Sequence, residues 1–98
     1  MGNMLKQAQQ MQAKMARMKE ELSQRTCSAT SGGGAVAVTV TCDFQVTEVK
    51  IDPEALKDGD AEMLQDLVMS AANQALKQAQ DTASQEMSKL TGGFKLPF

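Results

Sequence analysis

Three basic side chains near the start of the chain are spaced so that they could bind phosphate groups together. Lys6, Lys14 and Arg17 are the charged residues of the first eighteen positions, which contain no acidic residue. At about 100° per helical residue they fall within roughly 80° of one another, with Gln10 among them. Such a stripe is suited to phosphate contacts through charge and hydrogen bonds. On composition alone, the solvated face of an ordinary amphipathic helix is the more common origin of such a stripe, and both interpretations stay open.

Charge is distributed unevenly along the 98 residues. Ten Lys and Arg stand against twelve Asp and Glu, which gives a formal net charge of −2. Residues 1–25 contain five basic and two acidic residues, whereas residues 26–60 contain two basic and six acidic residues. The acidic pI of about 5.0 argues against strong non-specific DNA binding. The first segment is nevertheless locally positive.

Missing residue types exclude several chemistries. The sequence has no His, Trp or Tyr and three Phe. Without His, a Ser-His-Asp or Cys-His arrangement and an imidazole metal site are excluded. The scarcity of aromatic rings disfavours a stacking platform for single-stranded nucleic acid. The glycines at 32–34 lack the Gly-Lys-Ser/Thr ending of a phosphate loop and are interpreted as a turn. We therefore predict a protein that is not an enzyme and uses no metal, cofactor or small-molecule substrate.

Apolar residues near the N-terminus alternate in spacing between three and four positions, which predicts a helix over 3–24 with a heptad seam. The seam consists of Met4, Ala8, Met11, Met15, Met18 and Leu22. A short chain with eight Met and three Phe has little bulk to fill a core. We therefore expect a second copy of the chain to complete the core and to pair along this seam.

A period of two predicts three antiparallel strands within 26–51. One face of the middle strand consists of Val36, Val38, Val40 and Cys42. The apolar phase slips at Thr47 and Glu48, which predicts a bulge in the third strand. Cys27 and Cys42 fall on neighbouring strands and could face each other. We expect reduced packing residues here rather than a disulfide.

Two further helices follow the strands. A cap, a proline and an acidic first turn predict one helical turn over 53–57. Asp60 is then expected to cap a long, Ala-rich amphipathic helix over 60–90, followed by a tail at 91–98. The prediction is a single α+β domain over 1–98. Both long helices exceed the sheet in length, so their ends should project as arms of a homodimer.

The apolar runs are too short to span a membrane, and the N-terminus lacks the apolar core of a secretory signal. We therefore expect a cytoplasmic protein with no membrane partner.

Several segments in order resemble the YbaB/EbfC family of nucleoid-associated proteins, over essentially the whole chain. They are residues 1–12, the Gly-rich turn with the Val/Thr strand after it, 49–53, 62–68, 71–75 and 92–98. The resemblance implies a tweezer-like homodimer with protruding helices. It also implies binding of double-stranded DNA without enzymatic activity, in association with the bacterial nucleoid, in nucleoid organisation or gene regulation.

Carried onto this chain, the resemblance implies DNA contacts from Lys6, Lys14 and Arg17 on the first helix. The other candidate contacts are Gln10, Lys19, Arg25, Lys77 and Lys89, with Lys95 in the tail. The second long helix has few basic residues and includes Asp81 and Glu86, so we expect the first helix to make the main contacts.

One alternative belongs to another functional class. A dimeric adaptor or chaperone-like protein would use the Met-rich arms to bind a partner protein, because Met side chains adapt to varied apolar surfaces.

Overall fold

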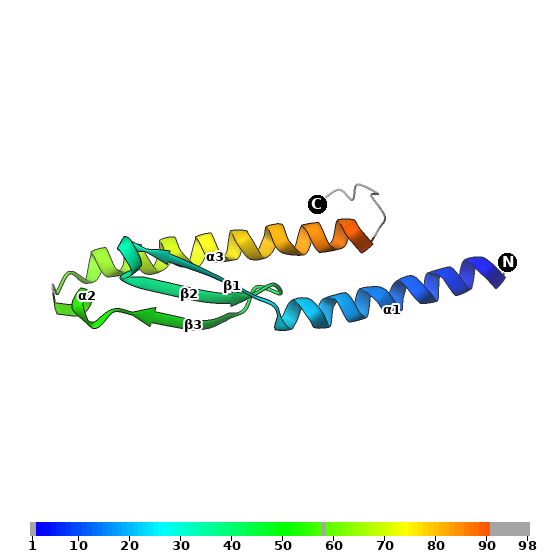
Figure 1. Ribbon diagram of the computed structural model, residues 1–98, viewed down its shortest axis with the longest axis horizontal. Coiled ribbons are helices and arrows are strands. Elements are labelled where there is room, and N and C mark those ends of the chain that lie inside the picture. Colours follow the sequence, from blue (N-terminus) through cyan, green and yellow to red (C-terminus); the bar gives the residue numbers. More distant parts are fainter. Residues whose placement is uncertain (1, 58, 91–98) are drawn as a thin grey trace.

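The computed structural model describes residues 2–57 and 59–90, so the predicted tail at 91–98 and Lys95 lie outside the described residues. The described elements are α1 (Gly2–Gln24), β1 (Thr26–Ser31), the 3-10 turn η1 (Gly32–Gly34), β2 (Val36–Thr41), β3 (Val46–Ile51), α2 (Pro53–Lys57) and α3 (Ala61–Leu90). The strands form one antiparallel sheet in the order β1-β2-β3 (Figure 1). The predicted α+β class, with a long helix at each end of a three-stranded sheet, is confirmed.

Helix boundaries follow local capping. α1 begins at Gly2, one residue before the predicted start. α3 begins at Ala61, and the preceding Asp60 accepts a hydrogen bond from the Met63 backbone N–H at 3.0 Å. Asp52 likewise accepts one from the Glu54 N–H at 3.0 Å at the start of α2. Both carboxylates satisfy backbone donors that a helix leaves unpaired at its first turn.

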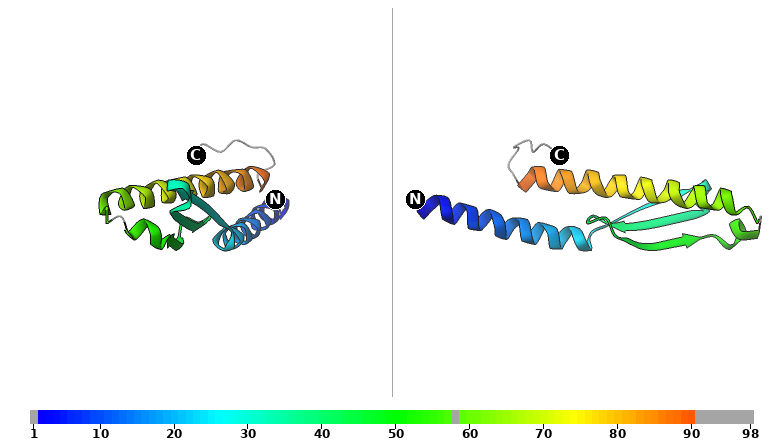
Figure 2. Two further views of the ribbon diagram at one scale, coloured as in Figure 1. Left: turned by 60° about the vertical axis from the view of Figure 1, so that its left-hand side comes forward. Right: turned by 180° about the vertical axis from the view of Figure 1, so that it is seen from behind.

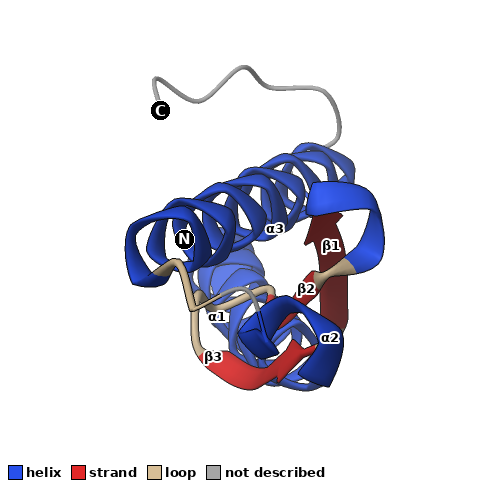
Figure 3. Ribbon diagram, turned by 90° about the vertical axis from the view of Figure 1, so that its left-hand side faces the viewer, coloured by secondary structure: helices blue, strands red, loops and turns tan. Residues whose placement is uncertain are grey.

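α3 covers one face of β1 and β2 (Figure 3). The residues at the centre of this layer are fully buried. They are Val36, Val38 and Val40 on β2, and Ala71, Ala75 and Ala79 on α3. Alanine at every fourth position presents a narrow, flat stripe that lets α3 lie close to the valines. The two-layer core therefore rests on small side chains.

The predicted bulge in β3 is present. Thr39 pairs with Glu48 and Val40 pairs with Val46, so one extra residue of β3, Thr47, has no partner on β2. Because an extra residue reverses the alternation, Val46 lies on the same face of the sheet as Val49. That face is the one that α3 covers over β1 and β2.

Both long helices extend past the same end of the sheet, which gives the molecule dimensions of 68 × 21 × 16 Å (Figures 1 and 2). α1 has 23 residues and is about 35 Å long. We call α1 and the last turns of α3 (83–90) the two arms. The base of the α1 arm is anchored in the core by Leu22, which is 7% exposed. The predicted projection of both helices beyond the strands is thus observed within a single chain.

The turn between β1 and β2 yields a stability prediction. Gly32 has φ +62°, and a Cβ atom there would lie 3.0 Å from both methyl groups of Leu67. We expect Gly32→Ala to lower the free energy of unfolding by about 2 kcal/mol, through left-handed backbone strain and overpacking. Gly33 has φ +67°, and a Cβ atom added there would have nothing within 4 Å. Gly33→Ala should therefore lower the free energy of unfolding by only about 1 kcal/mol. Urea denaturation of both variants measures the difference, and equal losses would contradict the role of Leu67.

Candidate nucleic-acid interface

The basic stripe predicted from the sequence lies on a regular helix. Lys6, Gln10, Lys14 and Arg17 all belong to α1, and their side chains are exposed. Helical geometry places them on one side of the arm, and Lys6 and Arg17 are about 17 Å apart along its axis. This length corresponds to roughly five base steps of duplex DNA. The stripe can therefore contact several successive phosphates on one strand.

The stripe ends in a notch between the two arms. Lys14 and Arg17 line this notch together with Met18, Glu21 and Leu90, and its volume is about 260 Å³. Since Leu90 is the last residue of α3, two of the three predicted phosphate contacts face the tip of the other arm. Glu21 lies on the same side of α1, about one turn after Arg17. The carboxylate marks where the positive surface ends.

Where the base of the α1 arm faces the α3 arm, Arg25 and Lys89 share one carboxylate. Glu86 Oε1 lies 3.1 Å from an Arg25 guanidinium nitrogen and 3.4 Å from Lys89 Nζ. The Lys89 ammonium, with a smaller contribution from Arg25, holds the pKa of Glu86 below its ordinary value. The carboxylate therefore stays charged at neutral pH, and its stabilising effect is lost only as the pH falls through this lowered pKa. Two candidate DNA contacts are thus already paired within the chain.

Two other candidates lie away from the stripe. Lys19 is exposed, but helical geometry places it about 140–160° around α1 from Lys14 and Arg17. Lys77 is exposed on α3 and lies on the opposite side of that helix from the buried Ala75 and Ala79. Neither side chain extends the positive surface of the α1 arm.

The predicted heptad seam divides into two parts. Leu22 is buried and Met18 packs against the chain's own core. Met4, Ala8, Met11 and Met15 are exposed, with Met4 at 77%. The apolar surface available to a partner is therefore the outer part of the seam, because Leu22 already has neighbours within the chain.

A second apolar surface on β3 was not predicted as a site. Val46 is 53% exposed and Val49 is 46% exposed, although both lie on the face of the sheet that α3 covers over β1 and β2. We call these two valines the β3 patch. The slip in apolar phase at Thr47 and Glu48 carried the signal, because a bulge there puts both valines on one face. Sequence reasoning did not predict that α3 leaves these two valines exposed, because their exposure depends on where α3 crosses the sheet.

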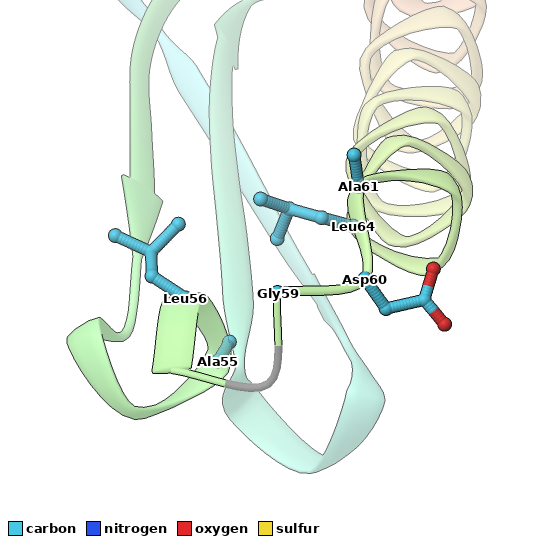
Figure 4. Close-up of a pocket in the computed structure, with 6 residues that line it drawn as sticks. All are labelled: Ala55, Leu56, Gly59, Asp60, Ala61 and Leu64. Carbon is cyan, nitrogen blue, oxygen red and sulfur yellow. The ribbon is translucent and has the colours of Figure 1, made fainter.

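The pocket between α2 and α3 offers little chemistry. Its volume is about 180 Å³, and among the described residues that line it all are apolar apart from Asp60 (Figure 4). The Asp60 carboxylate points away from Leu56 and Leu64 and already caps α3. In residues 2–57 and 59–90, no group of three or more acidic or Cys side chains is arranged to hold a metal ion. The described α1 arm remains the surface with the clearest binding chemistry.

Comparison with known proteins identifies the family. The profile of the YbaB/EbfC DNA-binding family matches residues 1–94. The chain belongs to this family. The resemblance drawn from the sequence segments is confirmed, and with it the description as a DNA-binding, nucleoid-associated type of protein.

Curated relatives agree with the family assignment, and a solved structure shares the fold. A nucleoid-associated protein of Pelotomaculum thermopropionicum is 50% identical over 97 residues, which cover 99% of this chain and 92% of the relative. A nucleoid-associated protein of Clostridium acetobutylicum is also 50% identical, over 99% of this chain and 87% of its own length. The crystal structure of an uncharacterized protein from Helicobacter pylori shares the fold, with a TM-score of 0.78, 23% identity, and coverage of 92% and 91% of the two chains.

Among the described residues, no helix has both the length and the hydropathy that crossing a membrane requires.

Proposed function

We propose that this protein binds double-stranded DNA as a homodimer, mainly through phosphate contacts from its α1 arms, and acts in nucleoid organisation or gene regulation. The observation that carries the proposal is the exposed stripe of Lys6, Lys14 and Arg17 on a projecting helix of a DNA-binding family member. Lys and Arg neutralise phosphates and release counterions, which favours binding regardless of base sequence. The protein then works in the cytoplasm on the nucleoid, without catalysis.

Phosphate contact rather than base reading suits the side chains of the arm. Sequence-specific reading in the major groove uses bidentate Arg, Asn or Gln side chains aimed at base edges. On α1, Arg17 lies one turn after Lys14, and Gln10 lies one turn before Lys14. Long, flexible lysines bind phosphate as point charges and do not impose a base preference. We therefore propose that the arm follows the DNA backbone.

The β3 patch supports a homodimer. Val46 and Val49 continue the apolar face that α3 covers on β2, yet each has about half of its surface in water. A second copy that covers this strand would complete the small core and place a second pair of arms beside the first. The outer seam, with Met4, Met11 and Met15, would extend the contact along the arms. Two copies of the stripe would then present six basic side chains to one duplex.

The proposed function is tested with a labelled duplex of mixed sequence, about 30 base pairs or roughly three helical turns long. Fluorescence anisotropy at low salt is expected to show saturable binding by the full chain. Unlabelled duplexes of unrelated sequence should compete equally well, because phosphates are common to all of them. Absence of binding at low salt would overturn the proposal. The exposed Met4 and Leu5 would then favour the adaptor interpretation.

Glu86 is expected to weaken DNA binding by occupying Arg25 and Lys89. We expect Glu86→Gln to tighten binding about threefold to tenfold at low salt, because it frees two cations and removes a carboxylate in each subunit. The matched control is Asp66→Asn, which removes an exposed carboxylate from α3 outside its arm. Unchanged or weaker binding by the Glu86 variant, measured by the same anisotropy titration, would show that Arg25 and Lys89 do not reach DNA.

A further inference from the structure

The two cysteines lie together where the α1 arm joins the sheet. Cys27 is the second residue of β1, and Cys42 follows the last residue of β2. Cys27 pairs with Val40, so Cys42 lies diagonally across from it on the same face of the sheet. Their sulfur atoms are 3.9 Å apart, and both thiols are free.

We propose that Cys27 and Cys42 form a reversible oxidation site, at which a hydroperoxide converts the two thiols into an intramolecular disulfide. The thiols differ in a way that orders the reaction. Cys27 is half-buried, whereas Cys42 is 1% exposed. A small oxidant therefore reaches Cys27 first, and Cys42 waits beside it as the resolving thiol.

The chemistry balances in two steps. Cys27 Sγ attacks one peroxide oxygen, the O–O bond breaks, and Cys27 becomes a sulfenic acid while hydrogen peroxide is reduced to water. Cys42 Sγ then attacks Cys27 Sγ, the S–S bond forms and the S–O bond breaks. The leaving hydroxide takes the Cys42 proton and becomes a second water. Two electrons pass from the two sulfurs to one peroxide.

The contacts around the two cysteines favour a disulfide within one chain. A disulfide needs about 2.0 Å between sulfurs, so the pair must approach by roughly 2 Å. Cys42 is held at this junction by its backbone N–H, which lies 3.0 Å from the Leu22 carbonyl oxygen and 2.8 Å from that of Arg25. Across the core, Cys27 Sγ is 4.0 Å from the Thr82 hydroxyl of α3. These contacts hold both thiols near one another.

Burial, with the neighbouring Cys27 thiol, raises the pKa of the Cys42 thiol. Cys42 therefore stays protonated at neutral pH and should not react with peroxide on its own. Its role as the second reactant follows from position, because a sulfenic acid at Cys27 is formed directly beside it. The disulfide would cross-link the start of β1 to the end of β2, at the point where the α1 arm joins the sheet.

The test treats the full-length folded protein with hydrogen peroxide, blocks remaining thiols with N-ethylmaleimide, and digests it with trypsin. No Lys or Arg lies between Arg25 and Lys50, so both cysteines fall in one tryptic peptide. We expect that peptide to lose the mass of two hydrogens, to resist alkylation, and to accept two alkyl groups after reduction. Retention of both thiols, disulfides only between chains, or oxidation to sulfinic acid without a disulfide would each overturn the proposal.

Thermal melting gives a second readout. The disulfide would link residues 15 positions apart and so restrict the unfolded chain. A relaxed bridge should therefore raise the melting temperature by roughly 10 °C, and reduction should reverse the shift. A fall in melting temperature would overturn the proposal, because it would show that the bridge distorts the native sheet. Cys27→Ser is the control: its single buried thiol should survive the same peroxide treatment unmodified. Neither readout involves DNA, so the outcome is independent of the proposed function.

Discussion

Lys14→Glu combined with Arg17→Glu is expected to weaken binding to duplex DNA by roughly 100-fold or more at low salt. In a dimer the double variant replaces four cations by four anions at the notch between the arms. Both side chains are exposed on α1, so their replacement should leave the fold intact. Anisotropy with the mixed-sequence duplex measures the loss, and circular dichroism verifies that the variant remains folded.

The matched control changes the same amount of charge elsewhere. Lys50→Glu with Lys57→Glu alters the net charge equally, but these lysines lie on β3 and α2, far from the arms (Figure 1). Lys50 and Lys57 make exposed ion pairs with Glu48 and Glu54, which contribute little to stability. We expect less than about a threefold change in affinity. A loss as large as that of the stripe variant would show that total charge, rather than the α1 arm, governs binding.

Val46→Glu combined with Val49→Glu is expected to convert the proposed homodimer into a monomer. Two carboxylates on the β3 patch would be buried without partners in the proposed interface, which no stable dimer tolerates. Sedimentation velocity should show half the mass of the wild-type particle. Affinity for DNA should also fall by roughly 100-fold, because one chain offers a single arm stripe and bivalency is lost.

Lys50→Glu serves as the control for the interface, since Lys50 lies on the opposite face of β3, paired with Ala37. It should leave the dimer intact. A dimer that persists in the valine variant would contradict the β3 interface. The dimer interface would then be expected on the outer seam, which consists of Met4, Ala8, Met11 and Met15.

Much of the fold could be predicted because local patterns decide local structure. Apolar spacing of three and four residues predicted α1, and the slip at Thr47 and Glu48 predicted the bulge that the pairing of β2 and β3 shows. Asp60 was expected to cap α3 and does so. In each case the physical cause lies within a few residues of its effect, so a single sequence contains it.

The features that the sequence did not predict depend on packing between residues that are far apart in the sequence. Met11 and Leu22 occupy the same heptad seam, yet only Leu22 is buried, because the sheet lies beside one end of α1 and not the other. Arg25 and Glu86 are separated by 61 positions, and no periodicity indicates that they pair. The uncovered β3 patch likewise follows from the path of α3 over β1 and β2. Sequence alone therefore predicted the stripe but not the ion pair beside it.

The central claim is that the α1 arms hold DNA through phosphates, and the salt dependence of affinity tests it most directly. Three basic residues on each of two arms should neutralise about six phosphates. The slope of the logarithm of the association constant against the logarithm of the salt concentration should then be about −5. The titration would run from roughly 50 to 200 mM salt on the mixed-sequence duplex. A slope near zero, or one unchanged in the Lys14→Glu, Arg17→Glu variant, would contradict the account.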